Sequence, residues 1–119
     1  MANIHHAIDY IELAVSDLAT TRSFYEDAFG WGFNDYGPEY AGIRAADGEG
    51  EVGGLNATAT PTPGAGPLVL LYSDDLDATV AAVERAGGTV TQGPYEFPGG
   101  RRFHFTDPGG NELGVWTKA

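Results

Sequence analysis

The fold of this chain is decided by residues 103–116, which read FHFTDPGGNELGVW. A proline and paired glycines between two apolar arms predict a tight hairpin turn. If Thr106 pairs with Glu112, one face of the hairpin is wholly apolar and should cover a core, while the other should face a cavity. That register pairs Phe105 with Leu113, His104 with Gly114, Phe103 with Val115 and Arg102 with Trp116.

A strand and a helix are predicted near the start of the chain. Residues 10–17, YIELAVSD, alternate along their first half between two sets of side chains, as in a strand with one face on a core. The next residues predict a helix with Asp17 as its N-cap and Gly30 at its end. Short strands separated by Gly- and Asp-rich turns should follow, up to about residue 59.

The same pattern begins again after a linker at residues 60–67, TPTPGAGP. The Asp-Leu pair at position 75 repeats the pair at position 17, with a strand before it and a glycine stop after it. Such an internal repeat predicts an α+β fold of two tandem βαβββ modules that form a curved mixed sheet around a cavity. The first module should span residues 8–59 and the second residues 68–117. Together they should form a single domain of residues 1–119.

The composition restricts the partners and the compartment. The chain has 17 acidic and 6 basic residues, a formal charge of −11 and no cysteine. This balance disfavours binding to a nucleic-acid backbone, and the missing cysteines exclude disulfides and thiolate chemistry. We see no signal peptide and no membrane-span pattern, so we expect a soluble cytoplasmic domain without a membrane partner. The acidity reflects either a solvated surface in a saline environment or a cleft that attracts cationic ligands.

Residues 17–31, DLATTRSFYEDAFGW, and residues 105–116, FTDPGGNELGVW, resemble the two signatures of the vicinal oxygen chelate superfamily. That superfamily contains glyoxalase I, extradiol dioxygenases, and fosfomycin- and bleomycin-resistance proteins. The resemblance runs from about Ile8 to Trp116. It implies two modules whose curved sheets enclose a cavity, with the helices outside. Family precedent also implies a homodimer, in which the modules pair either within one chain or between two.

The resemblance further implies four metal-ligand positions. They fall on Tyr10, Gly54, Leu68 and Gly114. Glycine and leucine offer no side-chain donor, and a neutral phenol binds divalent metals poorly. Glu112 lies on the expected face but one rung away, roughly 6–7 Å along the strand. We therefore expect a protein without a metal or other cofactor.

Strand alternation predicts which side chains line the pocket. Aromatic and aliphatic walls should be interrupted by a few ionisable groups, as is typical of small-ligand sites. The predicted lining consists of Tyr10, Glu12, Arg44, Leu68, Leu70, Tyr72, Arg102, His104, Glu112 and Trp116. Each has a structural alternative: the two glutamates could pair with the two arginines, the histidine could be a satisfied structural residue, and Tyr72 and Trp116 could simply fill the cavity.

Three classes of function remain open. The first is a metal-free protein that binds a cationic or aromatic small molecule, with sequestration of that compound as its role. The second is a glyoxalase-like lyase, isomerase or dioxygenase. It would use either a non-standard metal site or metal-independent acid–base chemistry, with Glu12 or Glu112 as base and His104 or Tyr10 as acid. The third is an accessory domain that acts by association with another protein. Turnover that survives a chelator would separate metal-independent catalysis from metal-dependent catalysis and from binding without turnover.

Overall fold

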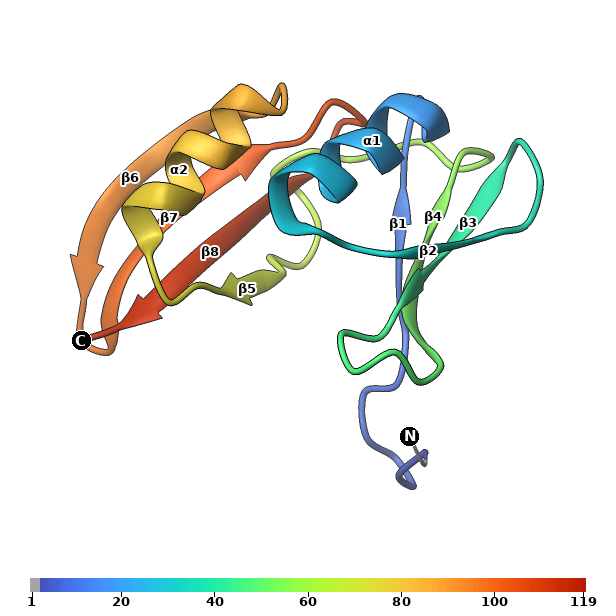
Figure 1. The fold of residues 1–119 in the computed structure, drawn as a ribbon, viewed down its shortest axis with the longest axis horizontal. Coiled ribbons are helices and arrows are strands. Elements are labelled where there is room, and N and C mark those ends of the chain that lie inside the picture. The colour runs from blue at the N-terminus through green and yellow to red at the C-terminus, as the bar shows by residue number, and fades with distance from the viewer. Residues whose placement is uncertain (1–2) are drawn as a thin grey trace.

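The structure is a computed structural model that describes residues 3–119, and this part of the chain contains two helices and eight strands (Figure 1). The first module consists of β1 (Ile11–Ala14), α1 (Leu18–Phe29), β2 (Phe33–Asp35), β3 (Tyr40–Arg44) and β4 (Glu51–Asn56). The second consists of β5 (Leu70–Tyr72), α2 (Leu76–Arg85), β6 (Thr89–Phe97), β7 (Gly100–Thr106) and β8 (Glu112–Lys118). Within residues 3–119, neither helix is long and apolar enough to cross a membrane.

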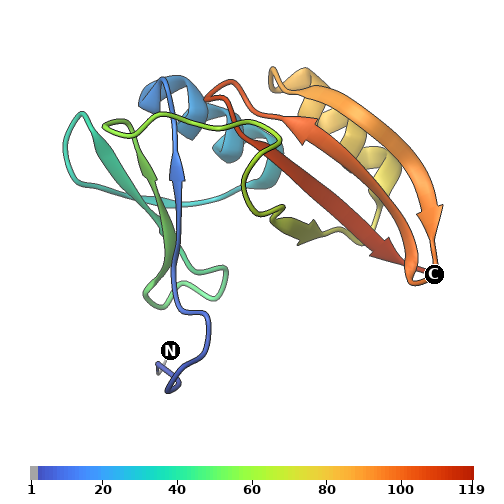
Figure 2. The same ribbon diagram turned by 180° about the vertical axis from the view of Figure 1, so that it is seen from behind.

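The two modules have the same topology. Their strand orders are β1-β4-β3-β2 and β5-β8-β7-β6, so each forms its own four-stranded sheet. In each sheet the first strand runs parallel to the last one, and the other pairs are antiparallel. The chain passes from β4 to β5 through the linker, which Figure 2 shows from behind. The tandem βαβββ fold predicted from the repeat is therefore confirmed.

Both helices begin at the predicted aspartates. The Asp17 carboxylate accepts a hydrogen bond from the backbone N–H of Thr20 at 3.0 Å, and Asp75 accepts one from Ala78 at 3.1 Å. Gly30 ends α1 with a φ of 71°, a left-handed conformation that glycine adopts without strain. The second helix instead has Ala86 as its C-cap in a right-handed conformation. The two modules therefore share the N-cap of their helix but differ in how the helix ends.

The predicted hairpin register between β7 and β8 is confirmed. Thr106 lies opposite Glu112, and the pairing continues without a shift to Arg102 opposite Trp116. The apolar face of this hairpin is the core of the molecule, because its residues Phe103, Phe105, Leu113 and Val115 are at most 1% exposed. The opposite face, with His104 and Glu112, points toward the space between the modules.

The core is shared between the modules. Helix α1 belongs to the first module, yet its Phe24 and Tyr25 lie in the same buried cluster as Phe103 and Phe105 of the second sheet. Ring centroids of Phe24 and Phe105 are 5.8 Å apart. In Figure 1, α1 lies between the two sheets and α2 lies over the outer side of the second one. The helices therefore join the modules while leaving the opposite sheet faces open.

The hairpin turn at residues 107–111, which we call the DPGGN turn, is a buried junction between the modules. The Asp107 carboxylate accepts hydrogen bonds from the Tyr25 hydroxyl of α1 at 2.7 Å and from the backbone N–H groups of Gly109 and Asn111, both at 2.9 Å. The Asn111 side-chain amide donates to the carbonyl of Ala14 at 2.7 Å. The turn thus fixes the second sheet against α1 and β1.

Candidate functional site

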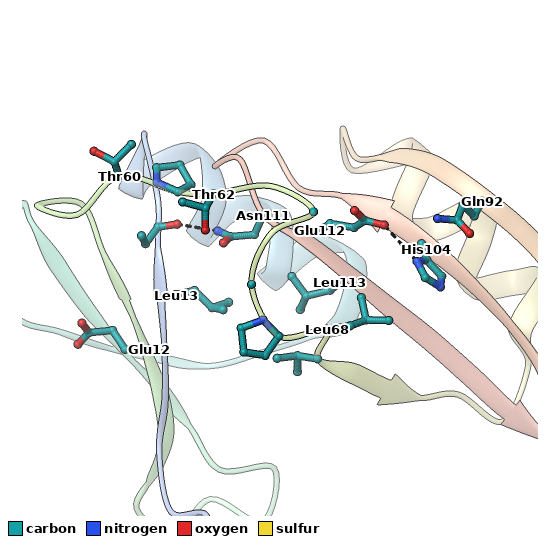
Figure 3. Close-up of a pocket in the computed structure, with 16 residues that line it drawn as sticks. Glu12, Leu13, Thr60, Thr62, Leu68, Gln92, His104, Asn111, Glu112 and Leu113 are labelled. Atoms are coloured by element: carbon teal, nitrogen blue, oxygen red, sulfur yellow. Dashed lines mark hydrogen bonds and ion pairs between the residues drawn. The ribbon is translucent and has the colours of Figure 1, made fainter.

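A cavity of about 450 Å³ opens between β1, the linker and the open face of the second sheet. We call it the inter-module cavity (Figure 3). Its polar lining includes Glu12, Gln92, His104, Asn111 and Glu112. The apolar lining includes Leu13, Leu68 and Leu113. The structure thus brings four of the residues predicted from sequence, Glu12, Leu68, His104 and Glu112, to one cavity.

His104 lies at the centre of a hydrogen-bonded chain. Its Nδ1 is 3.1 Å from a carboxylate oxygen of Glu112, and its Nε2 is 2.9 Å from the hydroxyl of Tyr95. The Arg102 Nε in turn donates to the Tyr95 hydroxyl at 2.5 Å. The imidazole is only 8% exposed, so these contacts satisfy a nearly buried polar group. The expected pairing of Glu112 with arginine is replaced by pairing with His104.

Tyr95 is not among the site residues predicted from the sequence, because β6 is irregular. Gln92 pairs with His104 and Tyr95 pairs with Arg102, so β6 advances by three residues where β7 advances by two. Such a β-bulge places Gln92 and Tyr95 on the same face, although an odd spacing would separate them in a regular strand. Gly93 lies inside the bulge with a φ of 81°. The glycine was the one sequence signal that pointed to this irregularity.

An aromatic wall continues from this chain along the second sheet. Trp116 packs edge-on against Tyr72, with 5.0 Å between ring centroids, and against Phe97 at 6.3 Å. The Arg102 guanidinium lies 5.4 Å from the Phe97 ring centre and 5.5 Å from that of Tyr95. Tyr72 is 44% exposed, so the wall presents apolar surface that the chain itself leaves open.

The first module contributes a second polar group around Gly54. The hydroxyls of Tyr10 and Tyr40 hydrogen-bond to each other, and the Glu12 carboxylate accepts from the side-chain amide of Asn56 at 3.0 Å. Tyr40 also hydrogen-bonds Glu12. A side chain at Gly54 would overlap the Tyr40 hydroxyl, since an added Cβ would stand within van der Waals contact of both phenols. Glycine is therefore required here for the two tyrosines to meet.

The four family metal positions do not fit a divalent ion. Gly54 and Gly114 supply no donor, and a Cβ at Gly114 would overlap the side chain of Leu70 on β5. Leu68 is apolar, and the Tyr10 phenol is hydrogen-bonded to Tyr40. Across residues 3–119, no group of three His, Asp or Glu side chains is placed to hold a metal ion.

Arg44 is not brought together with the other predicted residues. It lines a separate cavity of about 520 Å³, beside Phe29, Trp31 and Ile43. The pairing of β3 with β4 shifts between Ile43 and Arg44, where the partner changes from Gly53 to Glu51. This irregularity ends the regular alternation from which an inward orientation beside His104 was expected. Arg44 therefore lies outside the inter-module cavity.

Three tyrosines have raised pKa values, for different reasons. Burial raises the pKa of Tyr25 well above its ordinary value, and the nearby Asp107 carboxylate raises it further. Burial is also the largest cause for Tyr40, whose hydrogen bonds to its neighbours add to the rise. A hydrogen bond to Glu51, at 2.6 Å, raises the pKa of Tyr36. All three phenols are thus held in the protonated form.

Alkaline titration should show the raised pKa values of these three tyrosines. Because a raised pKa in the folded state favours the proton, the stability these groups provide is present below about pH 10 and is lost as the pH rises further. We expect phenolate absorbance that appears only above this pH, together with alkaline unfolding followed by circular dichroism. Complete phenolate formation near pH 10 with the fold intact would contradict the assignment.

Two βαβββ modules that present polar and aromatic side chains on the open faces of their sheets define the vicinal oxygen chelate fold class. The chain belongs to the Glyoxalase/Bleomycin resistance protein/Dioxygenase superfamily, whose family model matches residues 7–115. This agrees with the resemblance of the two sequence signatures.

Individual relatives are similar over most of this chain. CFP32 of Mycobacterium bovis is 32% identical over 117 residues, which cover 91% of this chain and 44% of CFP32. The chain therefore spans less than half of that relative. The crystal structure of TnmS3, an antibiotic binding protein from Streptomyces sp. CB03234, is 28% identical, covers 100% of this chain and 99% of that one, and has a TM-score of 0.72. A glyoxalase-related enzyme from Fulvimarina pelagi is 19% identical, with coverage of 95% and 88% and a TM-score of 0.80, and shows the same fold.

Proposed function

We propose that this protein binds a small aromatic cation without a metal ion and sequesters it. The observation that carries the proposal is the donor set at the four family metal positions, where two glycines, a leucine and a hydrogen-bonded phenol stand. The antibiotic-binding relative TnmS3 supports a binding role for this fold.

The carboxylates of the inter-module cavity support a cationic ligand. Glu12 and Glu112 line the same cavity from different modules, and the hydrogen-bonding partners described above for Glu12 are uncharged. A ligand cation beside the half-buried Glu112 would gain an attractive interaction in a partly desolvated site, and Glu12 adds negative charge at the rim of the cavity. The overall charge of −11 would raise the local concentration of such ligands.

The aromatic wall supports a planar ligand. Tyr72 and Trp116 offer ring faces and edges on the second sheet, further along it from Glu112, and stacked or edge-on ring pairs contribute about 0.5–1.5 kcal/mol beyond burial of area. Leu68 and Leu70 add exposed apolar surface along the same sheet edge, at 38% and 39%. A flat polycyclic ligand with one cationic group would contact both the wall and the carboxylates.

We further propose that two copies of the chain form a homodimer that closes this site. In one chain, the open faces of both modules expose large apolar side chains, among them Tyr10, Leu70 and Tyr72. A surface that exposes several large apolar side chains is a candidate for an interface. Sedimentation at micromolar concentration should therefore give a mass of two chains, and a monomer at that concentration would contradict the pairing.

The test uses three planar probes that differ in charge: proflavine as the cation, anthracene as the neutral compound and anthraquinone-2-sulfonate as the anion. We expect proflavine to bind most tightly by fluorescence titration, and its binding to weaken with added salt. Glu12→Gln and Glu112→Gln should each weaken proflavine binding about fivefold, in line with roughly 1 kcal/mol for a charge pair that water screens only in part.

A matched variant separates charge from stacking. Trp116→Ala should weaken all three probes by up to about tenfold, whatever their charge. Equal affinity for proflavine and the sulfonate would contradict the cationic preference. Calorimetric titration of chelator-treated protein with Ni²⁺, Zn²⁺, Mn²⁺ and Fe²⁺ tests the metal-free part, because stoichiometric binding at micromolar affinity would contradict it.

A further inference from the structure

The hydrogen-bonded chain through His104 crosses three adjacent strands without a break. Glu112 of β8 contacts one ring nitrogen of His104 on β7, and Tyr95 of β6 contacts the other. Arg102, also on β7, contacts Tyr95 from the opposite side. Glu112 and His104 line the inter-module cavity, whereas Tyr95 and Arg102 connect them to the aromatic wall.

The donors and acceptors of this chain fix where its protons lie. An arginine guanidinium can only donate hydrogen bonds, so the Tyr95 oxygen accepts from Arg102. The hydroxyl proton of Tyr95 can then be donated to Nε2 of His104, which is an acceptor when the ring is neutral. In the neutral ring the remaining proton is on Nδ1 and is donated to Glu112.

We propose that Tyr95 and Arg102 are positioning residues that hold neutral His104 with its proton on Nδ1. Protonation of Nε2 requires the Tyr95 hydroxyl to turn away, and it places a second cation near Arg102. From the other side of the ring, Glu112 accepts the proton on Nδ1. The arrangement therefore opposes neutralisation of Glu112 by its own histidine.

The consequence for binding rests on the proposed function. A neutral His104 orients one oxygen of Glu112, while the second oxygen points toward the linker at Gly64 and is free for a ligand cation. An imidazolium would compete with that cation for the same carboxylate. Tyr95 and Arg102 thereby keep the Glu112 carboxylate available to a ligand cation.

Nitrogen-15 NMR of the histidine side chains tests the proton positions without any ligand. In the full-length protein at mildly alkaline pH, we expect His104 to give the signature of an Nδ1–H ring with Nε2 as acceptor. A His104→Gln variant assigns the signal among the three histidines of the chain. Observation of the Nε2–H ring in the wild type would overturn the proposal.

Variants then test the positioning residues. Tyr95→Phe keeps the aromatic ring but removes the donor, and Arg102→Met removes the guanidinium while keeping most of the chain length. In both, the Nε2 signal of His104 should change at the same mildly alkaline pH, because Nε2 loses its donor in one variant and the donor loses its orientation in the other. The unfolding transition is checked separately. Tyr36→Phe is the matched control, because its hydroxyl contacts Glu51 instead. An unchanged Nε2 signal in the two positioning variants would overturn the proposal.

Proflavine titration at the pH of the NMR measurement distinguishes this inference from the function on which it rests. We expect Tyr95→Phe to bind proflavine more weakly than the wild type, and Tyr36→Phe to bind it as the wild type does. Loss of proflavine binding in the wild type, together with the expected NMR behaviour, would refute the cationic ligand and leave the positioning role supported. Equal proflavine affinity in the wild type and Tyr95→Phe would overturn the link between the two.

Discussion

Replacement of Asp107 by alanine should lower the free energy of unfolding by about 3 kcal/mol, because a buried donor that loses its partner costs roughly 1–3 kcal/mol. The carboxylate of Asp107 accepts from the Tyr25 hydroxyl and two backbone N–H groups, and the residue is 4% exposed. A loss of this size in a domain of 119 residues corresponds to a decrease in Tm on the order of 10 °C or more. Urea and thermal unfolding followed by circular dichroism would measure it.

Asp107→Asn is the matched control. It keeps an acceptor for both N–H groups, so we expect it to lose much less stability, about 1 kcal/mol. Burial raises the pKa of Asp107, partly offset by its hydrogen bonds. The stability that its proton provides is thus present below the ordinary aspartate pKa of about 3.9 and is lost as the pH rises through the higher folded value. Because asparagine does not titrate, the free energy of unfolding of the wild type should rise relative to that of Asp107→Asn as the pH falls. An Ala variant as stable as the Asn variant would contradict a junction role.

Phe105→Ala should cost about 3–5 kcal/mol, the usual range for truncating a fully buried aromatic side chain. Phe105 is 0% exposed, and its ring lies 5.7 Å from that of Phe29 and 5.8 Å from that of Phe24, both on α1. The cavity left behind would therefore separate α1 from the second sheet. Denaturant unfolding should show the loss and, because the core is shared, should remain one transition for both modules.

Phe33→Ala provides the comparison for Phe105→Ala. Phe33 is only partly buried at the edge strand of the first sheet, so its loss should be clearly smaller. Two resolved transitions in Phe105→Ala, with the first module melting separately, would show that the modules are independent and would contradict the shared core.

Local patterns were sufficient to predict most of the fold. The two N-cap aspartates and the repeated Asp-Leu pair identify both helices, because capping depends on residues close in sequence. The hairpin register followed from one turn, since its apolar and polar sets separate only if Thr106 faces Glu112. Glu12, Leu68, His104 and Glu112 reached the same cavity because strand alternation held at those positions.

The other site residues depend on features that local patterns do not contain. Tyr95 reaches His104 through a bulge in β6, and Arg44 leaves the expected face where the β3–β4 pairing shifts. The contact between Tyr10 and Tyr40 joins positions 30 residues apart and requires a glycine at position 54 on a third strand. Such contacts are set by the pairing of distant strands, so they become visible only once the sheets are assembled.

The buried DPGGN turn also has a kinetic consequence. Asn111 bonds a carbonyl 97 residues earlier, and Asp107 bonds a side chain 82 residues earlier, so nearly the whole chain must be present before α1 and β1 find their partners. Such long loops must close before these contacts can form, and the entropy lost on closure slows folding. During synthesis the first module would therefore wait, with Phe24 and Tyr25 uncovered, until the last strand has left the ribosome. Nascent chains truncated before residue 107 should be the species that chaperones retain.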